Sequence, residues 1–409
     1  MSLKIKKEQV KKIFLKHVRL QNYLTIQDTK IDLEPGLNII IGKNGVGKSN
    51  FIRYLKTSID FNIQSVSYHN AHLVFSRNKT TGFSIDIKSK IEKTIENGTP
   101  IIKTNLITFD IYKDKTLLHQ FDRYEDFYNF LNQEEFFFSA VFITHGLPAD
   151  YLLVEKPFSF KINQKGVLED YNKLLSSVRY HSHFLENIFN FIFYRGINLY
   201  QESKAPGKKE LERIIPETVE LLIPVESVLA KYSDIKAVRL NKNYNTVFNK
   251  VKSEFSVNNL SLEFKVGRQW LPFSHLSDGA RRLFYIISEI AFPTLFHFQE
   301  SEFALSTGET NKIVLIEEPE LGLHPHQLDS LLHFLQESSE EHQVIITTHA
   351  PQVLDILDKN ELNKIIIARL SRDGTTLRHL TRKEREKAAL YMEEEAYLSD
   401  YWRYSDLEV

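Results

Sequence analysis

Cysteine is absent from the 409-residue sequence, and this absence excludes disulfide bonds, cysteine-ligated zinc and thiol catalysis. A run of about eighteen apolar residues, the length that spans a membrane, is also missing. The first residues, MSLKIKKEQVKKIF, carry lysines, but no apolar segment follows them as it would in a secretory signal. We therefore expect a cytoplasmic protein with no membrane partner.

A strong excess of charge of either sign is missing as well. The formal net charge is −1, with 42% apolar and 26% charged residues, values typical of a folded chain rather than a disordered one. A protein that wraps nucleic acid over its whole surface would be basic, so any contact with DNA has to come from local patches. The length exceeds that of one ordinary core and predicts a main domain with a substantial insertion.

A glycine-rich stretch, GKNGVGKS at residues 42–49, is the most informative segment. It follows the apolar run 37–41 and precedes the helix-like segment 50–55, and strand, glycine-rich turn and helix start in this order are typical of a P-loop. Backbone N–H groups at such a helix start cradle the phosphates of a nucleotide. Lys48 would reach the β- and γ-phosphates, and the Ser49 hydroxyl would ligate Mg²⁺. The predicted ATP-binding residues are Gly42, Asn44, Gly45, Gly47, Lys48, Ser49 and Asn50.

Two further apolar strands lead into residues suited to hydrolysis. The strand 312–316 precedes Glu317 and Glu318, and the strand 343–347 precedes His349. Phosphoryl transfer to water needs one carboxylate near Mg²⁺ and a second that orients the attacking water. Neighbouring strand residues point to opposite faces, but the turn at the following proline lets both carboxylates address the metal and the γ-phosphate. The predicted catalytic residues are Glu317, Glu318 and His349, and the predicted metal ligands are Ser49 and Glu317.

The first half of the chain has mostly strand patterns. A hairpin over residues 13–33, broken at 21–22, precedes the P-loop, and four short strands are predicted between residues 72 and 121. The nearly continuous apolar run 136–143 is typical of a strand buried on both faces. The loop that follows this strand is expected to open near the nucleotide. His145 in this loop could sense the γ-phosphate or be an ordinary loop histidine.

The second half begins with helical patterns. Residues 168–255 are predicted to be helical, and a hairpin over 260–273 leads to an amphipathic helix that Ser277 would cap. Residues 300–311 are polar and predict an exposed insertion. The resulting division is an ATPase core at 1–62 and 260–409, a β-rich subdomain at 63–160 and a helical lid insertion at 161–259.

A group of basic residues in the helical region leaves two interpretations open. They could form a face for nucleic acid, or they could be a solvated surface balanced by nearby glutamates. The group comprises Lys204, Lys208, Lys209, Lys236, Arg239 and Lys242.

Several motifs together resemble one family of ATPases. The loop ending GKSN, the leading hairpin, LSDGARR, IEEPELGLHP and TTHAP are similar to the RecF, SMC and OLD branch of ABC-class AAA family ATPases. The resemblance implies an α/β P-loop NTPase fold, an ABC-type head with a β-rich subdomain and a helical lid. It also implies that Glu317 is the Mg²⁺-associated acid, Glu318 the catalytic base and His349 the switch histidine. Ser277 and Gly279 match the signature loop that caps the γ-phosphate bound by the opposite protomer.

The chain departs from the family pattern at some positions. Asp278 replaces the first glycine of the transporter LSGGQ loop, and Glu317 stands where aspartate is more usual. No glutamine is assigned to the Q-loop, and Tyr23 is the candidate adenine contact.

The resemblance further implies that two ATP molecules with Mg²⁺ would be bound in a homodimer or a higher homo-oligomer.

The resemblance also suggests a biological role. OLD proteins continue into a Toprim nuclease, whereas this chain ends 60 residues after His349 (409 − 349), which predicts no nuclease of its own. No apolar heptad repeat persists, which disfavours SMC proteins. The compact head is similar to the ATPase subunits of the antiphage systems Septu and PARIS, where the ATPase is sensor and scaffold for a separate effector nuclease. A RecF-like DNA repair ATPase is the alternative, and an energy-coupling transporter subunit is a third reading that GKSN and IEEPE oppose.

Overall fold

The computed structural model divides the chain into two compact units, each of which is described by itself. Unit 1 comprises Met1–Gln9, Gly146–Glu309 and Gly322–Leu331, and unit 2 comprises Val10–His145, Thr310–Leu321 and Leu332–Val409. The structure describes residues 12–61, 70–77, 80–96, 99–134, 136, 138–147, 158–163, 182–203, 206–251, 253–292, 294–299, 302–306, 311–394 and 397–405. The three-part division predicted from sequence follows other boundaries and stays a prediction.

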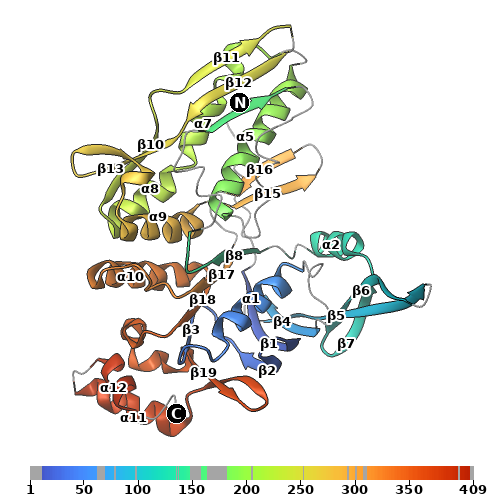
Figure 1. Cartoon of the computed structure of the whole chain (residues 1–409), viewed down its shortest axis with the longest axis vertical. Coiled ribbons are helices and arrows are strands. Elements are labelled where there is room, and N and C mark those ends of the chain that lie inside the picture. The colour runs from blue at the N-terminus through green and yellow to red at the C-terminus, as the bar shows by residue number, and fades with distance from the viewer. Residues whose placement is uncertain are drawn as a thin grey trace. The chain divides into compact units, whose positions relative to one another are not determined.

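A six-stranded, mostly parallel sheet forms the centre of unit 2 (Figure 1). Its order is β20-β19-β3-β18-β17-β8, and only the edge strand β20 is antiparallel to its neighbour. The prediction that these apolar runs are strands is confirmed, and every residue of β3, β17 and β18 is buried. The bounds are β3 (Leu37–Ile41), β8 (Ser139–Ile143), β17 (Lys312–Glu317), β18 (Gln343–Thr348), β19 (Ile365–Ser371) and β20 (Gly374–His379).

A second, antiparallel sheet of unit 2 has the order β2-β1-β4-β5-β6-β7. The predicted hairpin before the P-loop is present, but its turn lies at residues 24–25 rather than at 21–22, because β1 stays paired with β2 as far as Tyr23. The four strands predicted between residues 72 and 121 are confirmed. The bounds are β1 (Ile13–Tyr23), β2 (Ile26–Asp32), β4 (Asn70–Arg77), β5 (Thr80–Glu96), β6 (Thr99–Lys113) and β7 (Thr116–Phe121).

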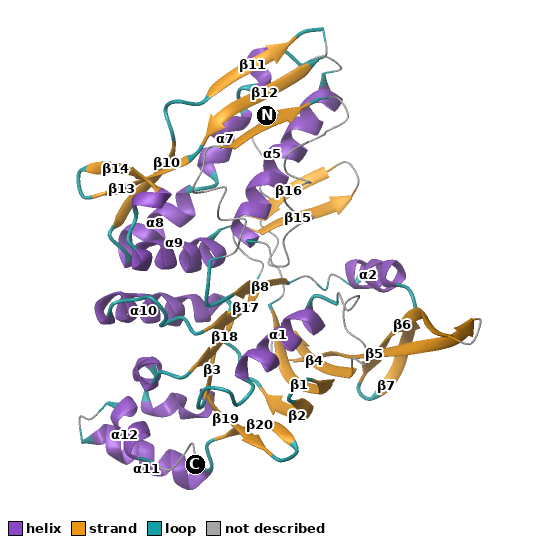
Figure 2. Ribbon diagram, in the orientation of Figure 1, coloured by secondary structure: helices purple, strands orange, loops and turns teal. Residues whose placement is uncertain are grey.

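Helices complete unit 2 (Figure 2). Helix α1 buries Phe51, Ile52 and Leu55 in a core that it shares with both sheets, and α2 stacks Phe127 on Phe109 with ring centroids 4.3 Å apart. The helical bounds are α1 (Lys48–Ile59), α2 (Tyr124–Gln133), α10 (Pro325–Glu341, which begins in unit 1), η3 (Pro351–Ile356), η4 (Lys359–Lys364), α11 (Arg382–Glu393) and α12 (Leu398–Tyr404).

Two buried side-chain amides join the two sheets of unit 2. Asn311 Oδ1 accepts from the Ile13 N–H at 2.9 Å, and Asn311 Nδ2 donates to the Ile13 carbonyl. Gln343 repeats the pattern on Leu15, where Oε1 accepts at 2.8 Å and Nε2 donates at 2.8 Å. Each amide thus satisfies backbone groups of β1 as another strand would. The sequence prediction of an exposed 300–311 segment is therefore wrong for Asn311, which is 1% exposed.

Unit 1 mixes helices with small sheets. Three antiparallel sheets have the orders β10-β13-β14, β11-β12-β9 and β15-β16. Phe284 of α9 packs edge-on against Phe184 of α5 and Phe264 of β13, with ring centroids 5.6 Å and 4.7 Å apart. The bounds are β9 (Phe158–Ile162), α5 (His183–Glu202), α6 (Lys208–Leu211), α7 (Ile214–Glu220), α8 (Ile223–Tyr232), β10 (Ile235–Leu240), β11 (Asn245–Asn249), β12 (Glu254–Leu260), β13 (Leu262–Val266), β14 (Gln269–Pro272), η2 (Phe273–His275), α9 (Asp278–Ala291), β15 (Thr294–Gln299) and β16 (Glu302–Ser306).

The predicted helical region is corrected in its second part. Helices occupy much of residues 183–232, but β10, β11 and the start of β12 occupy 235–255. Ile235 and Val238 in β10 are buried, and β11 alternates between exposed and half-buried positions, a pattern with the period of a strand. The 300–311 segment also contains strand β16.

Candidate functional site

The P-loop of unit 2 connects β3 to α1, as the sequence predicts. Helix α1 begins at Lys48, and Gly45 and Gly47 have left-handed backbones with φ of 82° and 97°. Lys48 is 6% exposed, and its Nζ donates to the carbonyl oxygens of Gly42 at 2.6 Å and Lys43 at 2.9 Å. The backbone carbonyls of the P-loop thus hold the Lys48 ammonium group. Ser49 follows Lys48 as the second residue of α1.

Two threonines that the sequence did not point to brace this loop. Thr375 Oγ1 lies 2.9 Å from the Val46 carbonyl oxygen and 2.8 Å from Thr25 Oγ1. Asn50 Nδ2 donates to Thr25 Oγ1 at 3.0 Å. A Cβ added at Gly47 would overlap Thr375 Oγ1 and lie 2.5 Å from Thr25 Oγ1. The bracing pair comes from the turn after β1 and from β20, so no local pattern could have revealed it.

The strand register brings Glu317, Glu318 and His349 to one edge of the sheet, where β3 leads into the P-loop. Thr348 pairs with Ile41 and Glu317 with Thr347, so the ends of β3, β17 and β18 are level. Ile316 pairs with Ile143, which places the loop after β8 at this edge as well. In parallel sheets ligands bind outside the carboxyl ends of the strands.

Glu317 is buried at this edge, with 1% of its side chain exposed. Its Oε2 accepts from Arg53 Nη2 of α1 at 3.0 Å, and His145 Nδ1 lies 3.5 Å from the same oxygen. A buried carboxylate costs free energy unless an opposite charge or hydrogen bonds compensate it. Arg53 provides this compensation and was missed at the sequence level, because arginine after a P-loop resembles any solvated helix residue. His145 lies beside Glu317, and its role as a phosphate sensor stays a prediction.

Glu318 and His349 face each other across neighbouring strands. His349 Nδ1 lies 3.4 Å from Glu318 Oε1, and the two side chains are 35% and 24% exposed. The chain does not first turn at the proline, as the sequence suggested, because Glu318 itself has a left-handed backbone with φ of 46°. Its N–H donates to the Thr347 carbonyl at 2.8 Å, and the Leu321 N–H donates back to the Glu318 carbonyl at 3.2 Å. This turn separates the two glutamate side chains.

The signature residues lie in unit 1 at the start of α9. Ser277 is exposed and is the N-cap, as predicted, with its Oγ accepting from the Ala280 N–H at 3.2 Å. Asp278 accepts from Arg281 at 2.7 Å. Gly279 is buried, and an added Cβ there would overlap the side-chain amide of Gln327. Their action on a second protomer stays a prediction.

Tyr23 packs into the wall beside the P-loop helix. Its ring centroid lies 4.8 Å from that of Tyr54, which is 1% exposed. Tyr54 Oη donates to the carbonyl oxygen of Gln21 or Asn70, at 2.6 Å and 3.0 Å, and burial raises the pKa of Tyr54 to about 12. The structure therefore gives Tyr23 a packing role, and its contact with adenine stays a prediction.

Three of the six basic residues that could form a nucleic-acid face have acidic or carbonyl partners. Arg239 pairs with Glu263 at 2.7 Å and stacks over Trp270 at 3.9 Å, and Lys208 pairs with Glu212 at 3.5 Å. Lys236 Nζ donates to backbone carbonyls at 2.8 and 3.1 Å. These contacts favour the interpretation of a balanced surface over a nucleic-acid face. Lys204 lies outside the described residues.

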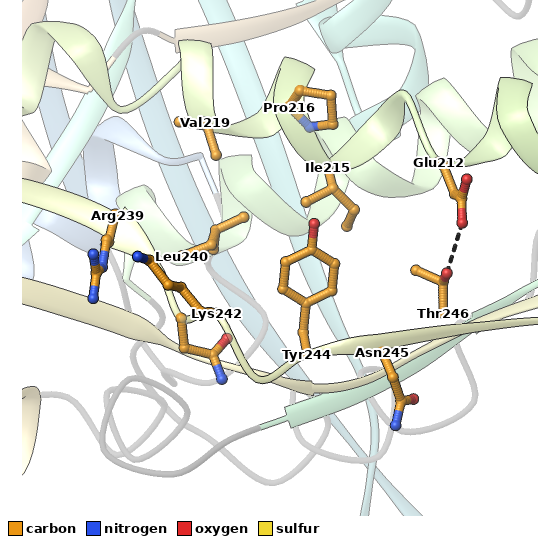
Figure 3. A pocket seen from close by; sticks show the side chains of 11 residues that line it. Glu212, Ile215, Pro216, Val219, Arg239, Leu240, Lys242, Tyr244, Asn245 and Thr246 are labelled. Atoms are coloured by element: carbon orange, nitrogen blue, oxygen red, sulfur yellow. Dashed lines mark hydrogen bonds between the residues drawn. The ribbon is translucent and has the colours of Figure 1, made fainter.

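A pocket of about 880 Å³ also lies in unit 1, between α7 and the chain that joins β10 to β11 (Figure 3). Ile215 and Val219 line one side, and Leu240 and Tyr244 line the other. None of the predicted ATP or Mg²⁺ residues lines it. It is therefore separate from the P-loop site.

The donor set at the sheet edge fits Mg²⁺. The ion prefers oxygen ligands and is usually held by one or two carboxylates together with phosphate oxygens and water. Ser49 follows the buried Lys48 on α1, and Arg53 of the same helix contacts Glu317, so a hydroxyl and a carboxylate belong to the same end of the site. In the described part of the chain no group of three or more His, Asp or Glu side chains is arranged to hold a metal by itself.

No described helix is long and apolar enough to cross a membrane.

Comparisons with known proteins agree with this architecture. The family described as "AAA domain, putative AbiEii toxin, Type IV TA system" matches residues 37–355. An ATP/GTP phosphatase of Helicobacter pylori is 23% identical over 364 residues, which are 84% of this chain and 88% of that protein. The DNA double-strand break repair Rad50 ATPase of Sulfolobus acidocaldarius is 45% identical over 40 residues, which are 10% of this chain and 4% of Rad50.

Solved structures show the same fold. An SMC head bound to the C-terminal winged-helix domain of ScpA has a TM-score of 0.51 at 14% identity, covering 91% of this chain and 99% of the SMC chain. An SMC head with an extended coiled coil, bound to the C-terminal domain of ScpA derived from Pyrococcus furiosus, has a TM-score of 0.50 at 14% identity, covering 94% and 99%. The chain therefore belongs to the AAA_21 family of AAA domains and has the α/β P-loop ATPase fold that is seen in SMC heads.

Proposed function

We propose that the chain hydrolyses ATP at the sheet edge of unit 2, that two copies close around two ATP molecules, and that this closure gates a separate effector nuclease in bacterial antiphage defence. The observation that carries the catalytic part is the strand register, which levels the ends of β3, β17 and β18. This register supports a site in which residues from three separate sequence motifs contact one nucleotide.

Each residue has a distinct task in this proposal. Backbone N–H groups at the start of α1 bind the phosphates, and Lys48 Nζ leaves the carbonyls of Gly42 and Lys43 to contact the γ-phosphate. Mg²⁺, held by Ser49 and Glu317, would neutralise charge on the phosphate oxygens. A Glu318 carboxylate oxygen accepts the proton of the attacking water. His349 contacts the γ-phosphate through Nε2, because its Nδ1 faces Glu318.

Closure around two ATP molecules rests on the signature residues. Ser277 is exposed at the N-terminus of α9, where helix N–H groups and a hydroxyl can meet a γ-phosphate from another copy. The SMC heads of similar fold are bound to a separate protein, ScpA. The family's description as a putative toxin of a type IV TA system also supports a role together with a partner. The similarity to an ATP/GTP phosphatase supports the hydrolytic step.

The Glu318→Gln variant tests the proposal. The amide keeps the side-chain shape but cannot accept the proton, so ATP should bind, turnover should stop and closed dimer should accumulate. A shift of about 1.4 kcal/mol would change the ratio of closed to open forms tenfold. Sedimentation with Mg²⁺-ATP measures the closed form, and Glu340→Gln on the exposed face of α10 is the control.

Two outcomes would contradict parts of the proposal. If Glu318→Gln hydrolyses ATP at the wild-type rate, Glu318 is not the catalytic base. If the closed dimer accumulates but binds a nuclease encoded beside this chain no differently from wild type, the gating role is wrong and the ATPase assignment stands.

A RecF-like role in DNA repair is the second candidate, and the short match to Rad50 favours it. In that case duplex DNA with free ends should bind in the presence of ATP and should stimulate turnover. Binding measured by fluorescence anisotropy at two salt concentrations tests this, because phosphate contacts weaken as salt rises. No ATP-dependent binding would exclude it.

A further inference from the structure

We propose that Glu320, which has no task in the mechanism above, is the positioning residue that orients the imidazole of His349 for its contact with the γ-phosphate. The proposal rests on the proposed function, in which His349 meets the nucleotide. All of the contacts involved lie within unit 2.

Glu320 first holds the backbone that carries the histidine. Thr348 Oγ1 donates to Glu320 Oε1 at 2.6 Å, and the His349 N–H donates to the same oxygen at 3.3 Å. Thr348 Oγ1 also accepts from the Ala350 N–H at 3.0 Å. The end of β18 and the residue after it are therefore tied to one carboxylate oxygen from the turn after β17.

The same carboxylate faces the ring. His349 Nδ1 lies 3.5 Å from Glu320 Oε1 and 3.4 Å from Glu318 Oε1. The imidazole thus has its Nδ1 side between two carboxylates, and Nε2 is the ring nitrogen left for a ligand. Nδ1 makes no hydrogen bond at these distances, so the carboxylates act through their negative charge, which favours a proton on the ring nitrogen that faces them.

Burial separates Glu320 from an ordinary surface acid. Its side chain is 8% exposed, against 24% for Glu318 and 35% for His349. Burial disfavours the charge of this carboxylate, and the hydrogen bonds from Thr348 and the His349 N–H offset part of that cost. A purely structural task, closing the turn through Thr348, requires a hydrogen-bond acceptor but no charge.

The Glu320→Gln variant separates these two tasks. The amide oxygen can still accept from Thr348, whereas the negative charge beside Nδ1 is lost. We expect kcat for ATP to fall roughly 10- to 100-fold, as for a misplaced catalytic group, with ATP affinity unchanged. Glu340→Gln, the same change at an exposed position of α10, should leave kcat unchanged.

A double-mutant cycle shows whether the effect passes through the histidine. If Glu320 acts through His349, Glu320→Gln should cause no further loss of kcat in a His349→Ala background. A second measurement needs no turnover: the ring ¹⁵N signals of His349, identified by their absence in His349→Ala, should shift in nucleotide-free Glu320→Gln and stay in place in Glu340→Gln.

The outcomes separate this proposal from the proposed function. Unchanged ring signals in Glu320→Gln, losses that multiply in the cycle, or wild-type turnover of His349→Ala would each overturn the positioning role. Wild-type turnover of Glu318→Gln, with shifted ring signals and a non-additive cycle, would remove the assigned base and support the positioning role.

Discussion

Replacing Gly47 by alanine should strain the P-loop in two ways that the structure separates. The residue has φ of 97°, where a β-carbon costs roughly 1–2 kcal/mol. The added Cβ would also overlap Thr375 Oγ1 and lie 2.5 Å from Thr25 Oγ1, an overpacking of about 1–3 kcal/mol. Together these terms predict a loss of about 2–5 kcal/mol in the free energy of unfolding.

Gly45 is the matched control for this prediction. Its φ of 82° is similar, but an added Cβ would meet no atom within 4 Å. Gly45→Ala should therefore lose only about 1–2 kcal/mol. Gly47→Ala should thus be less stable than Gly45→Ala by about 1–3 kcal/mol. For a domain of this size that difference lowers the melting temperature of Gly47→Ala by about 2–12 °C relative to Gly45→Ala.

The assay is thermal unfolding of both variants without nucleotide, combined with amide hydrogen exchange. In Gly47→Ala the Thr375 hydroxyl has to move away from the Val46 carbonyl, so exchange should rise both in the P-loop and in β20. Equal melting temperatures for the two variants, together with unchanged exchange in β20, would refute the bracing of the loop by Thr25 and Thr375.

Lys48→Ala should abolish ATP binding, measured by calorimetry, because the γ-phosphate loses its P-loop cation; retained affinity would contradict the P-loop assignment. Ser277→Arg should leave ATP binding by one protomer intact and stop hydrolysis, and a mixture with Lys48→Ala should regain at most one of the two sites. Normal hydrolysis by Ser277→Arg would contradict closure between protomers. The pKa of His342 is lowered to about 4, first by burial and then by nearby Lys312, so the folded state keeps this histidine neutral. The contribution of His342 to the free energy of unfolding is complete above pH 6.5, near the pKa of a histidine in the unfolded chain. It falls by about 3 kcal/mol as the pH drops to 4. Urea unfolding of His342→Asn between pH 7 and 4 should show a smaller decline than wild type, and an equal decline would refute this.

The strands that carry the candidate site could be predicted because their signals are local. The runs before Gly42, Glu317 and His349 are rich in isoleucine, leucine and valine, and strands buried on both faces have this pattern. The site residues follow these runs directly. Their position at one edge then follows from parallel pairing.

What the sequence could not predict depends on distant partners. Thr375 braces Val46 from 329 residues away, and Asn311 pairs with the backbone of Ile13 from 298 residues away. An asparagine in a polar stretch looks solvated until its backbone partner is known. The strands β10 and β11 were missed because their few apolar residues alternate among polar ones, next to a region of clear helical pattern.

The left-handed backbone at Glu318 means that the proposed catalytic base lowers the stability of the fold that holds it. At φ of 46° glycine or asparagine fits best, and glutamate is held there at a cost of roughly 1–2 kcal/mol. Substitution of Glu318 by glycine or asparagine should therefore raise the free energy of unfolding and abolish the proposed hydrolysis. Selection for ATP hydrolysis would then have to maintain the carboxylate against these more stable variants. In a lineage that keeps nucleotide-driven closure but no longer needs hydrolysis, this residue should be among the first to change, and the descendant should melt at a higher temperature than its active ancestor.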